Sequence, residues 1–330
     1  MKIVVFGSQR RVGLWDDDTV VDVNNAAADY LSTKMSKSEA VAKADRDAPA
    51  DLEKFIVAGK QALELARAAA AHVKGSKDGS LTQRISSVKL HAPWPGRRIF
   101  CAGTNYGQHV LNYLTNIGQP KSRKEIEDET RKYDPGGFTK TLLEVTAPDE
   151  GLRYPSRTTQ LDYEAELAVV IGTRGTDIAA AQAKNYIWGI TLANDWSDRD
   201  AQFPRIPLSF NLMKNFNGSL SLGPCIIVDD SDPQDIDITL EVNGEVRQDY
   251  NTNQMIYSFA EYIAYLSKDL TLLPGDLLLG GTGAGTAADA SKRAPDGSPV
   301  NLDLFLKVGD VVEIKSPKIG SLRNRVVAKQ

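Results

Sequence analysis

The sequence predicts an α+β protein that is rich in β-structure, with a small N-terminal α/β domain in residues 1–90 and a larger domain in residues 91–330. Three observations predict this class. Beyond residue 90 the chain consists mostly of short apolar segments separated by Gly, Pro and Asp, which is typical of strands joined by turns. Only two stretches in that part have helical spacing. Strands and helices do not alternate regularly, so a doubly wound parallel sheet is not expected.

Strand-like and helical segments follow one another in the first 90 residues. The segments KIVVF (residues 2–6) and RRVGLWDDDTVVDV (residues 10–23) predict strands, and the acidic DDD turn folds the second into a hairpin. In residues 51–74 apolar side chains recur at helical spacing between the opening PAD and the closing Gly75, which predicts a helix. The polar segment KGSKDGSLTQR (residues 74–84) is expected to be a linker.

The larger domain is predicted to be built mainly from strands. Apolar runs bounded by turn residues predict them at residues 98–103, 166–172, 187–195, 223–230, 238–246, 276–283 and 310–316. Helical spacing occurs in residues 177–188 and 258–270. Residues 112–138 are polar, charged and rich in turn residues. We expect a lid over a site here, with a solvated surface loop as the alternative.

The composition favours small-molecule partners. The 330 residues are 42% hydrophobic and 25% charged, with a net charge of -4 at pH 7. Because nucleic acids and anionic membranes attract basic surfaces, neither is expected as the main partner. No run reaches the roughly 18 apolar residues of a membrane span, so we expect a soluble, cytoplasmic protein. Cys101 and Cys225 lie in separate apolar segments, which predicts free core thiols.

Acidic residues interrupt a strand-like run in LDYEAELAVVIG (residues 161–172). Side chains two residues apart in a strand share a face, and their backbone positions lie about 7 Å apart. Glu164 and Glu166 are therefore expected to project together. Asp162, at the edge of the strand, is expected only to cap it. A second apolar strand ends in acids that begin at Asp195. One interpretation is a solvated outer face. The other is a metal site, because three carboxylates suit a hard divalent cation such as Mg²⁺, with Mn²⁺ or Ca²⁺ as alternatives.

Several motifs occur in an order that resembles the fumarylacetoacetate hydrolase family. They are the LDYEAELAVVIG run, NDWSDRDAQ (residues 194–202), LLPGDLLLGGTGAG (residues 272–285), and LKVGDVVEI followed by IGSLRN (residues 306–324). The resemblance covers about residues 99–327. It implies a fumarylacetoacetate hydrolase-like mixed β-roll core, a metal-dependent enzyme that acts on 2-oxo acids, and a homodimer.

The resemblance also implies which residues form the site. Matched motif by motif, the metal ligands are Glu164, Glu166 and Asp195, the residues that face the substrate are Arg199, Gln202, Lys214 and Thr282, and the general base is His109. Lys214, as a point charge, and Arg199, as a planar fork, would hold a substrate carboxylate or a developing oxyanion.

Three positions depart from the family pattern. Asn112 stands where an acid usually partners the histidine, Asn217 stands where Asp is common, and Gly283 stands where Pro is usual. An amide can orient an imidazole but cannot stabilise its cation by charge. The base is therefore expected to lack an acidic partner, and the substrate is less sharply defined.

Three functions are compatible with these residues. The first is hydrolysis of a carbon–carbon bond in an acylpyruvate- or fumarylpyruvate-type acid, through an enolate held on Mg²⁺. The second, on the same scaffold, is isomerisation, decarboxylation or hydration of an oxo-enol dicarboxylic acid from aromatic or sugar-acid catabolism. The third is a catalytically silent protein that binds an oxo acid, which the two asparagine departures motivate.

Overall fold

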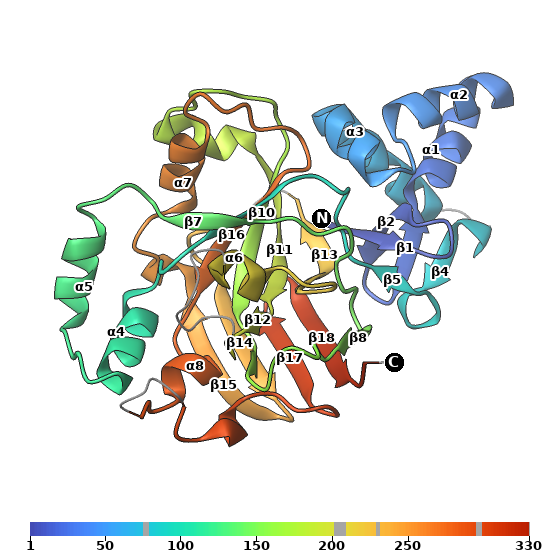
Figure 1. Cartoon of the computed structure of the whole chain (residues 1–330). Coiled ribbons are helices and arrows are strands. Elements are labelled where there is room, and N and C mark those ends of the chain that lie inside the picture. Colours follow the sequence, from blue (N-terminus) through green and yellow to red (C-terminus); the bar gives the residue numbers. More distant parts are fainter. Residues whose placement is uncertain (75–78, 201–208, 229–231, 295–298, 330) are drawn as a thin grey trace.

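A computed structural model describes residues 1–74, 79–200, 209–228, 232–294 and 299–329. Within these residues the strands form a large eleven-stranded sheet, a five-stranded sheet and a separate pair. Helices α1 (Val23–Ser32), α2 (Lys37–Asp47) and α3 (Leu52–Lys74) lie at one end of the molecule, and α4 (Gly107–Asn116) and α5 (Arg123–Thr130) lie at the other (Figure 1). The remaining helices are α6 (Ser209–Lys214), α7 (Phe259–Leu266) and α8 (Ala287–Ala290).

The large sheet runs in the order β4-β3-β2-β1-β13-β11-β10-β16-β6-β7, with β5 beside β1. Its strands are β1 (Lys2–Phe6), β2 (Arg11–Asp16), β3 (Thr19–Asp22), β4 (Thr82–Arg84), β5 (Leu90–His91), β6 (Ile99–Ala102), β7 (Gly137–Lys140), β10 (Ala165–Ile171), β11 (Ile187–Asp195), β13 (Leu220–Ile227) and β16 (Leu277–Thr282). Its pairs are antiparallel except for β16 with β6.

The smaller sheet has the order β15-β14-β17-β18-β8. Its strands are β8 (Gly151–Arg153), β14 (Asp237–Val242), β15 (Glu245–Asn251), β17 (Val311–Ser316) and β18 (Gly320–Val327), and the separate pair is β9 (Leu161–Asp162) with β12 (Ser197–Asp198). Each predicted strand overlaps an observed one, although residues 229 and 230 of the predicted strand 223–230 lie outside the described residues. The single strand predicted at residues 238–246 is wrong in its second half, because this segment contains most of β14, a turn and only the start of β15. The predicted β-rich α+β class is confirmed.

The large sheet is buried on both faces. On β1, Val4 and Phe6 belong to the core that also contains strands of the smaller sheet, whereas Ile3 and Val5 belong to a second core with Phe55 of α3. This division follows from the strand geometry, because successive side chains point to opposite faces. All seven residues of β10 are likewise buried. The strand that carries Glu166 is thus packed between two apolar layers.

The N-terminal strands are continuous with the large sheet. Strand β1 pairs with β13, with Lys2 opposite Ile227. The prediction of a linker is wrong for the second half of residues 74–84, because Thr82–Arg84 forms β4 and pairs with β3. The division of the chain at residue 90 remains a proposal, since this sheet crosses it.

The helices differ from the sequence expectations in several places. The predicted helices are confirmed at α3, which is interrupted where Gly59 takes a φ of 57°, and at α7. Residues 180–186 form a 3-10 helix, and no side chain caps its start. The polar segment 112–138 contains the end of α4 and all of α5 rather than only irregular structure. Helices α1 and α2 were not predicted.

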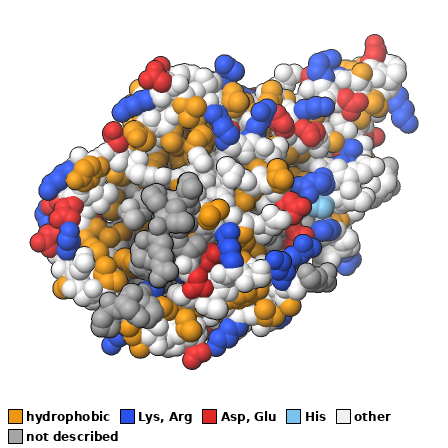
Figure 2. Space-filling model, viewed as in Figure 1, with side chains coloured by type: hydrophobic (Ala, Val, Ile, Leu, Met, Phe, Trp, Pro, Cys, Tyr) orange, Lys and Arg blue, Asp and Glu red, His pale blue; other side chains and the backbone are white. Residues whose placement is uncertain are grey.

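The surface and the thiols agree with the composition. Acidic and basic side chains are interspersed over the face in Figure 2. Cys101 and Cys225 are free and buried, as predicted. Within the described ranges, each helix is either too short or too polar to cross a membrane.

Candidate active site

Three buried carboxylates meet at the point where β10 begins and the neighbouring strand β11 ends. Strands β10 and β11 are antiparallel, with Glu166 opposite Ala193, and the Asp195 N–H donates to the Glu164 carbonyl oxygen at 2.9 Å. One carboxylate oxygen from each of Glu164, Glu166 and Asp195 lies within 4.8 Å of the others. None of the three residues is more than 5% exposed. Strand pairing therefore brings together acids that are far apart in the sequence, and the solvated outer face that was the alternative is not formed.

Three basic side chains compensate these acids inside the core. The Lys214 ammonium donates to Glu164 Oε2 at 2.5 Å and to Asp195 Oδ2 at 2.9 Å. The Arg199 guanidinium donates to Glu164 Oε1 at 2.5 Å. The Lys140 ammonium, at the end of β7, lies 2.6 Å from Asp195 Oδ1 and is fully buried. The sequence analysis missed Lys140, because lysine is rarely buried and the flanking Thr139 and Thr141 give no sign that the side chain is inside.

Glu166 is the least compensated of the three acids. Its Oε2 accepts the backbone N–H of Gly281 at 2.8 Å, and no basic side chain among the described residues is ion-paired with it. Burial, and next the charges of Asp195 and Glu164, raise the pKa of Glu166 well above its ordinary value. Burial would also raise the pKa of Glu164, but the charges of Lys214 and Arg199 outweigh it and hold that pKa at about 2.

The donor set fits a hard divalent cation. Carboxylate oxygens are the ligands that Mg²⁺, Mn²⁺ and Ca²⁺ prefer. The Lys214 ammonium already contacts two of the three acids as a single positive charge, which shows that the acids attract a cation. Among the described residues no basic side chain is ion-paired with Glu166, so a further cation would meet an uncompensated carboxylate there. This trio, Glu164, Glu166 and Asp195, could therefore hold a metal ion.

His109 has an acidic partner that the sequence analysis did not find. His109 lies on α4, and its Nδ1 is 2.7 Å from Asp289 Oδ2 on α8. Asn112, in contrast, accepts a hydrogen bond from Gln108 at 2.8 Å. The expectation that the histidine lacks an acid is therefore wrong. The two residues are 180 positions apart, so no local signal could have revealed the pair.

Asp162 links the carboxylates to α8. It is completely buried and accepts from Arg199 Nε at 2.9 Å. It also accepts the backbone N–H groups of Ala287 at 2.8 Å and Ala288 at 3.0 Å. The expectation that Asp162 only caps the strand edge is therefore wrong, because its carboxylate holds the helix that carries Asp289.

Of the other predicted site residues, the structure describes Thr282 but not Gln202. The Thr282 hydroxyl is buried, donates to the Ala165 carbonyl oxygen at 2.8 Å and accepts from Gln248 at 2.8 Å. Its role in substrate binding remains a prediction. Gln202 lies outside the described residues. At Gly283 a Cβ atom would come within 2.4 Å of the Tyr250 ring, which explains why a larger residue is not accommodated there.

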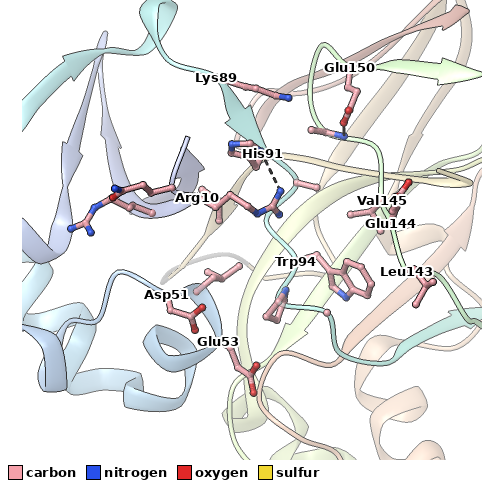
Figure 3. Close-up of a pocket in the computed structure, with 18 of the residues that line it drawn as sticks. Arg10, Asp51, Glu53, Lys89, His91, Trp94, Leu143, Glu144, Val145 and Glu150 are labelled. Atoms are coloured by element: carbon pink, nitrogen blue, oxygen red, sulfur yellow. Dashed lines mark hydrogen bonds between the residues drawn. The ribbon is translucent and has the colours of Figure 1, made fainter. Parts of the chain in front are cut away.

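A cavity of about 1020 Å³ lies elsewhere, beside the N-terminal strands (Figure 3). Its walls carry charges of both signs, including Arg10, Lys89 and Glu144. Arg10 Nη1 lies 3.3 Å from His91 Nδ1, and His91 Nε2 bonds to the Gly7 carbonyl oxygen at 2.8 Å. None of the predicted site residues that the structure describes lines this cavity. We place the candidate active site at the carboxylates, where buried acids, bases and a histidine converge.

Residues 98–327 match the family described as "Fumarylacetoacetate (FAA) hydrolase C-terminal". The chain belongs to this family, as the motifs indicated. The relatives named below are enzymes that act on small molecules.

The similarity to particular relatives extends over most of the chain. The mitochondrial oxaloacetate tautomerase of Xenopus laevis is 33% identical over 286 residues, which are 86% of this chain and 80% of that protein. Oxaloacetate tautomerase YisK of Bacillus subtilis (strain 168) is 30% identical over 316 residues, which are 94% of each protein. Among solved structures, the fumarylacetoacetate hydrolase of psychrophilic Exiguobacterium antarcticum matches with a TM-score of 0.68, 27% identity and coverage of 100% of both chains.

Proposed function

We propose that this protein is a divalent-metal-dependent tautomerase that interconverts the keto and enol forms of a short 2-oxo dicarboxylic acid such as oxaloacetate. The main observation behind this proposal is the buried set of Glu164, Glu166 and Asp195. The similarity to two oxaloacetate tautomerases supports the choice of reaction. The isomerase function, which the sequence analysis ranked second, is therefore placed ahead of hydrolysis.

The residues of this chain can divide the work of such a reaction. Glu164, Glu166 and Asp195 would hold the ion, which supplies a Lewis acid to the two oxygens of a chelating 2-oxo acid. Lys214 and Arg199 are cationic groups beside the same acids and would orient the substrate's carboxylates. With Nδ1 engaged by Asp289, Nε2 of His109 is the ring nitrogen left to take a proton from carbon 3 of the keto form and pass it to the oxygen on carbon 2, which gives the enol. The same two transfers in reverse regenerate the keto form.

Hydrolysis of a carbon–carbon bond in an acylpyruvate- or fumarylpyruvate-type acid is the second candidate. The similarity to the Exiguobacterium hydrolase over the whole chain favours it. The same histidine would then take a proton from an attacking water instead of from substrate carbon. Decarboxylation, hydration and catalytically silent binding of an oxo acid are the remaining candidate functions, and the assay must distinguish them from the first two.

The test follows the ultraviolet absorbance of the enol. Enol-oxaloacetate is added to the protein with Mg²⁺, Mn²⁺ or Ca²⁺, and again after chelation, and the rate is compared with buffer alone. We expect acceleration that chelation abolishes and metal restores. Acetylpyruvate and fumarylpyruvate are tested in parallel with product analysis. Cleavage of these substrates with no effect on enol-oxaloacetate would replace the tautomerase by the hydrolase, and tight binding without any turnover would leave only the binding protein.

The metal and the setting are part of the same proposal. The three carboxylate donors suit Mg²⁺, which we propose as the ion, with Mn²⁺ and Ca²⁺ as alternatives. The cytoplasmic location remains a proposal, since the relatives include a mitochondrial protein as well as a bacterial one. The homodimer is likewise a proposal, and light scattering of the purified protein tests it.

A further inference from the structure

We propose that Asp289 is the positioning residue for His109 and replaces the acid that the family pattern places at position 112. This inference rests on the proposed function for its rate measurements, but not for its spectroscopic test. The pair joins two helices that are distant in sequence, α4 and α8. The separation of His109 Nδ1 from Asp289 Oδ2 is 2.7 Å, and the Asp289 side chain is fully buried.

The geometry fixes which ring nitrogen carries a proton. A carboxylate only accepts hydrogen bonds, so Nδ1 of a neutral His109 must be the donor to Asp289. Nε2 then presents its lone pair, which is the form that a general base needs. Without the acid, the ring could rotate and take either tautomer. The Asn112 side chain is not a substitute, because its oxygen is engaged by Gln108.

The protein holds Asp289 in place from two directions. Asp289 accepts the N–H of Gly285, at 3.1 Å to Oδ1 and 3.0 Å to Oδ2. The Asp289 N–H in turn donates to Thr286 Oγ1 at 3.2 Å. From the other side, α4 is tied to α8 because Asn116 Nδ2 donates to the Asp289 carbonyl oxygen at 2.6 Å. The acid is therefore ordered before any substrate arrives.

A chain of buried contacts connects this pair to the metal ligands. Arg199 bridges Glu164, at 2.5 Å, and Asp162, at 2.9 Å. Asp162 accepts the N–H groups of Ala287 and Ala288 at the start of α8, immediately before Asp289. The carboxylates and the histidine are thus held by one hydrogen-bonded network. Such outer partners orient the groups that do chemistry.

Within the described part of the chain, the other charged groups on the elements packed against α4 have partners of their own. The nearby carboxylate of Glu164 is held by Lys214 and Arg199. On α5, Glu127 is paired with Arg123. After α8, the backbone N–H of Arg293 donates to the Asn116 carbonyl oxygen at 3.2 Å. Asp289 is the acid in direct contact with the ring.

The first experiment replaces Asp289 by Asn. Asp289→Asn keeps an oxygen for the Gly285 N–H, so it removes the charge with little change to the loop. We expect kcat to fall about 10- to 100-fold, which is the usual effect of losing an orienting partner, with KM and the calorimetric Mg²⁺ affinity little changed. The double variant Asn112→Glu, Asp289→Asn should recover part of the rate, because position 112 is three residues from His109 on the same helix face. A folded single variant with wild-type kcat, or a folded double variant with no recovery, overturns the proposal.

The second experiment needs neither a variant nor activity. Nitrogen-15 NMR of the wild-type imidazole at pH 8.5 reports which ring nitrogen is protonated. We expect the proton on Nδ1 of His109, and a mixture or the Nε2-protonated form overturns the proposal. If the wild-type protein shows no tautomerase activity, the proposed function fails while this measurement still decides the role of Asp289.

Discussion

Replacing Lys140 by Met tests whether the buried lysine compensates the acids. The Lys140 side chain is fully buried, with its ammonium 2.6 Å from Asp195 Oδ1. It also donates to the Lys214 carbonyl oxygen at 2.5 Å and to the Ser219 carbonyl oxygen at 2.9 Å. Methionine fills a similar volume without a polar head, so the substitution isolates the charge and its hydrogen bonds.

The expected loss of stability can be worked from these contacts. Removing one partner of a buried ion pair costs about 3–5 kcal/mol, because the other charge stays buried. The Lys214 carbonyl oxygen keeps a hydrogen-bond donor, because the Ser219 hydroxyl lies 2.9 Å from it. The Ser219 carbonyl oxygen loses the Lys140 ammonium as its donor, and leaving such a buried acceptor unpaired costs about 1–3 kcal/mol. Lys214 still compensates Asp195 at 2.9 Å, which reduces the total. We therefore expect the free energy of unfolding to fall by about 3–5 kcal/mol.

Urea denaturation in the presence of a chelator measures this difference. The matched control is Lys124→Met on α5, where the lysine is 82% exposed and pairs with Asp128. An exposed pair of this kind contributes little to stability, because solvent screens it. A loss below about 1 kcal/mol for Lys140→Met would refute the reasoning, because a buried pair costs more than that to break.

Three further predictions concern the acids and the base. Glu166→Ala and Asp195→Ala should abolish Mg²⁺ binding in calorimetry, since a hard cation with three carboxylates cannot spare one; unchanged affinity would remove the metal assignment. His109→Ala should keep Mg²⁺ binding and lose the rate, and wild-type turnover would eliminate His109 as the base. Because the pKa of Glu166 is raised in the folded state above its ordinary 4.5, this carboxyl group binds more protons in the metal-free folded protein than in the unfolded chain above that pH. Its stability should therefore decrease as pH rises from 4.5 towards the raised pKa, and urea midpoints that show the same slope in Glu166→Gln would contradict this.

Local patterns were sufficient for the strands that carry the acids. The apolar run of β10 and the period of two around Glu164 and Glu166 depend only on neighbouring residues. A capping signal, Ser followed three residues later by Glu, precedes α7, where a helix was predicted. The same signal at Ser122 and Glu125 precedes α5, so this helix could also have been predicted. There the polar composition concealed it.

The sequence by itself determined the class of fold, the family, and the carboxylates that lie two residues apart on one strand. These features depend on local periodicity and on motif order, which a chain carries in consecutive residues. Only the tertiary structure decided that Lys140 is buried against Asp195, that Asp162 anchors α8, and that Asp289 meets His109. Those contacts join residues on separate elements, and which elements meet depends on how both faces of the large sheet are packed.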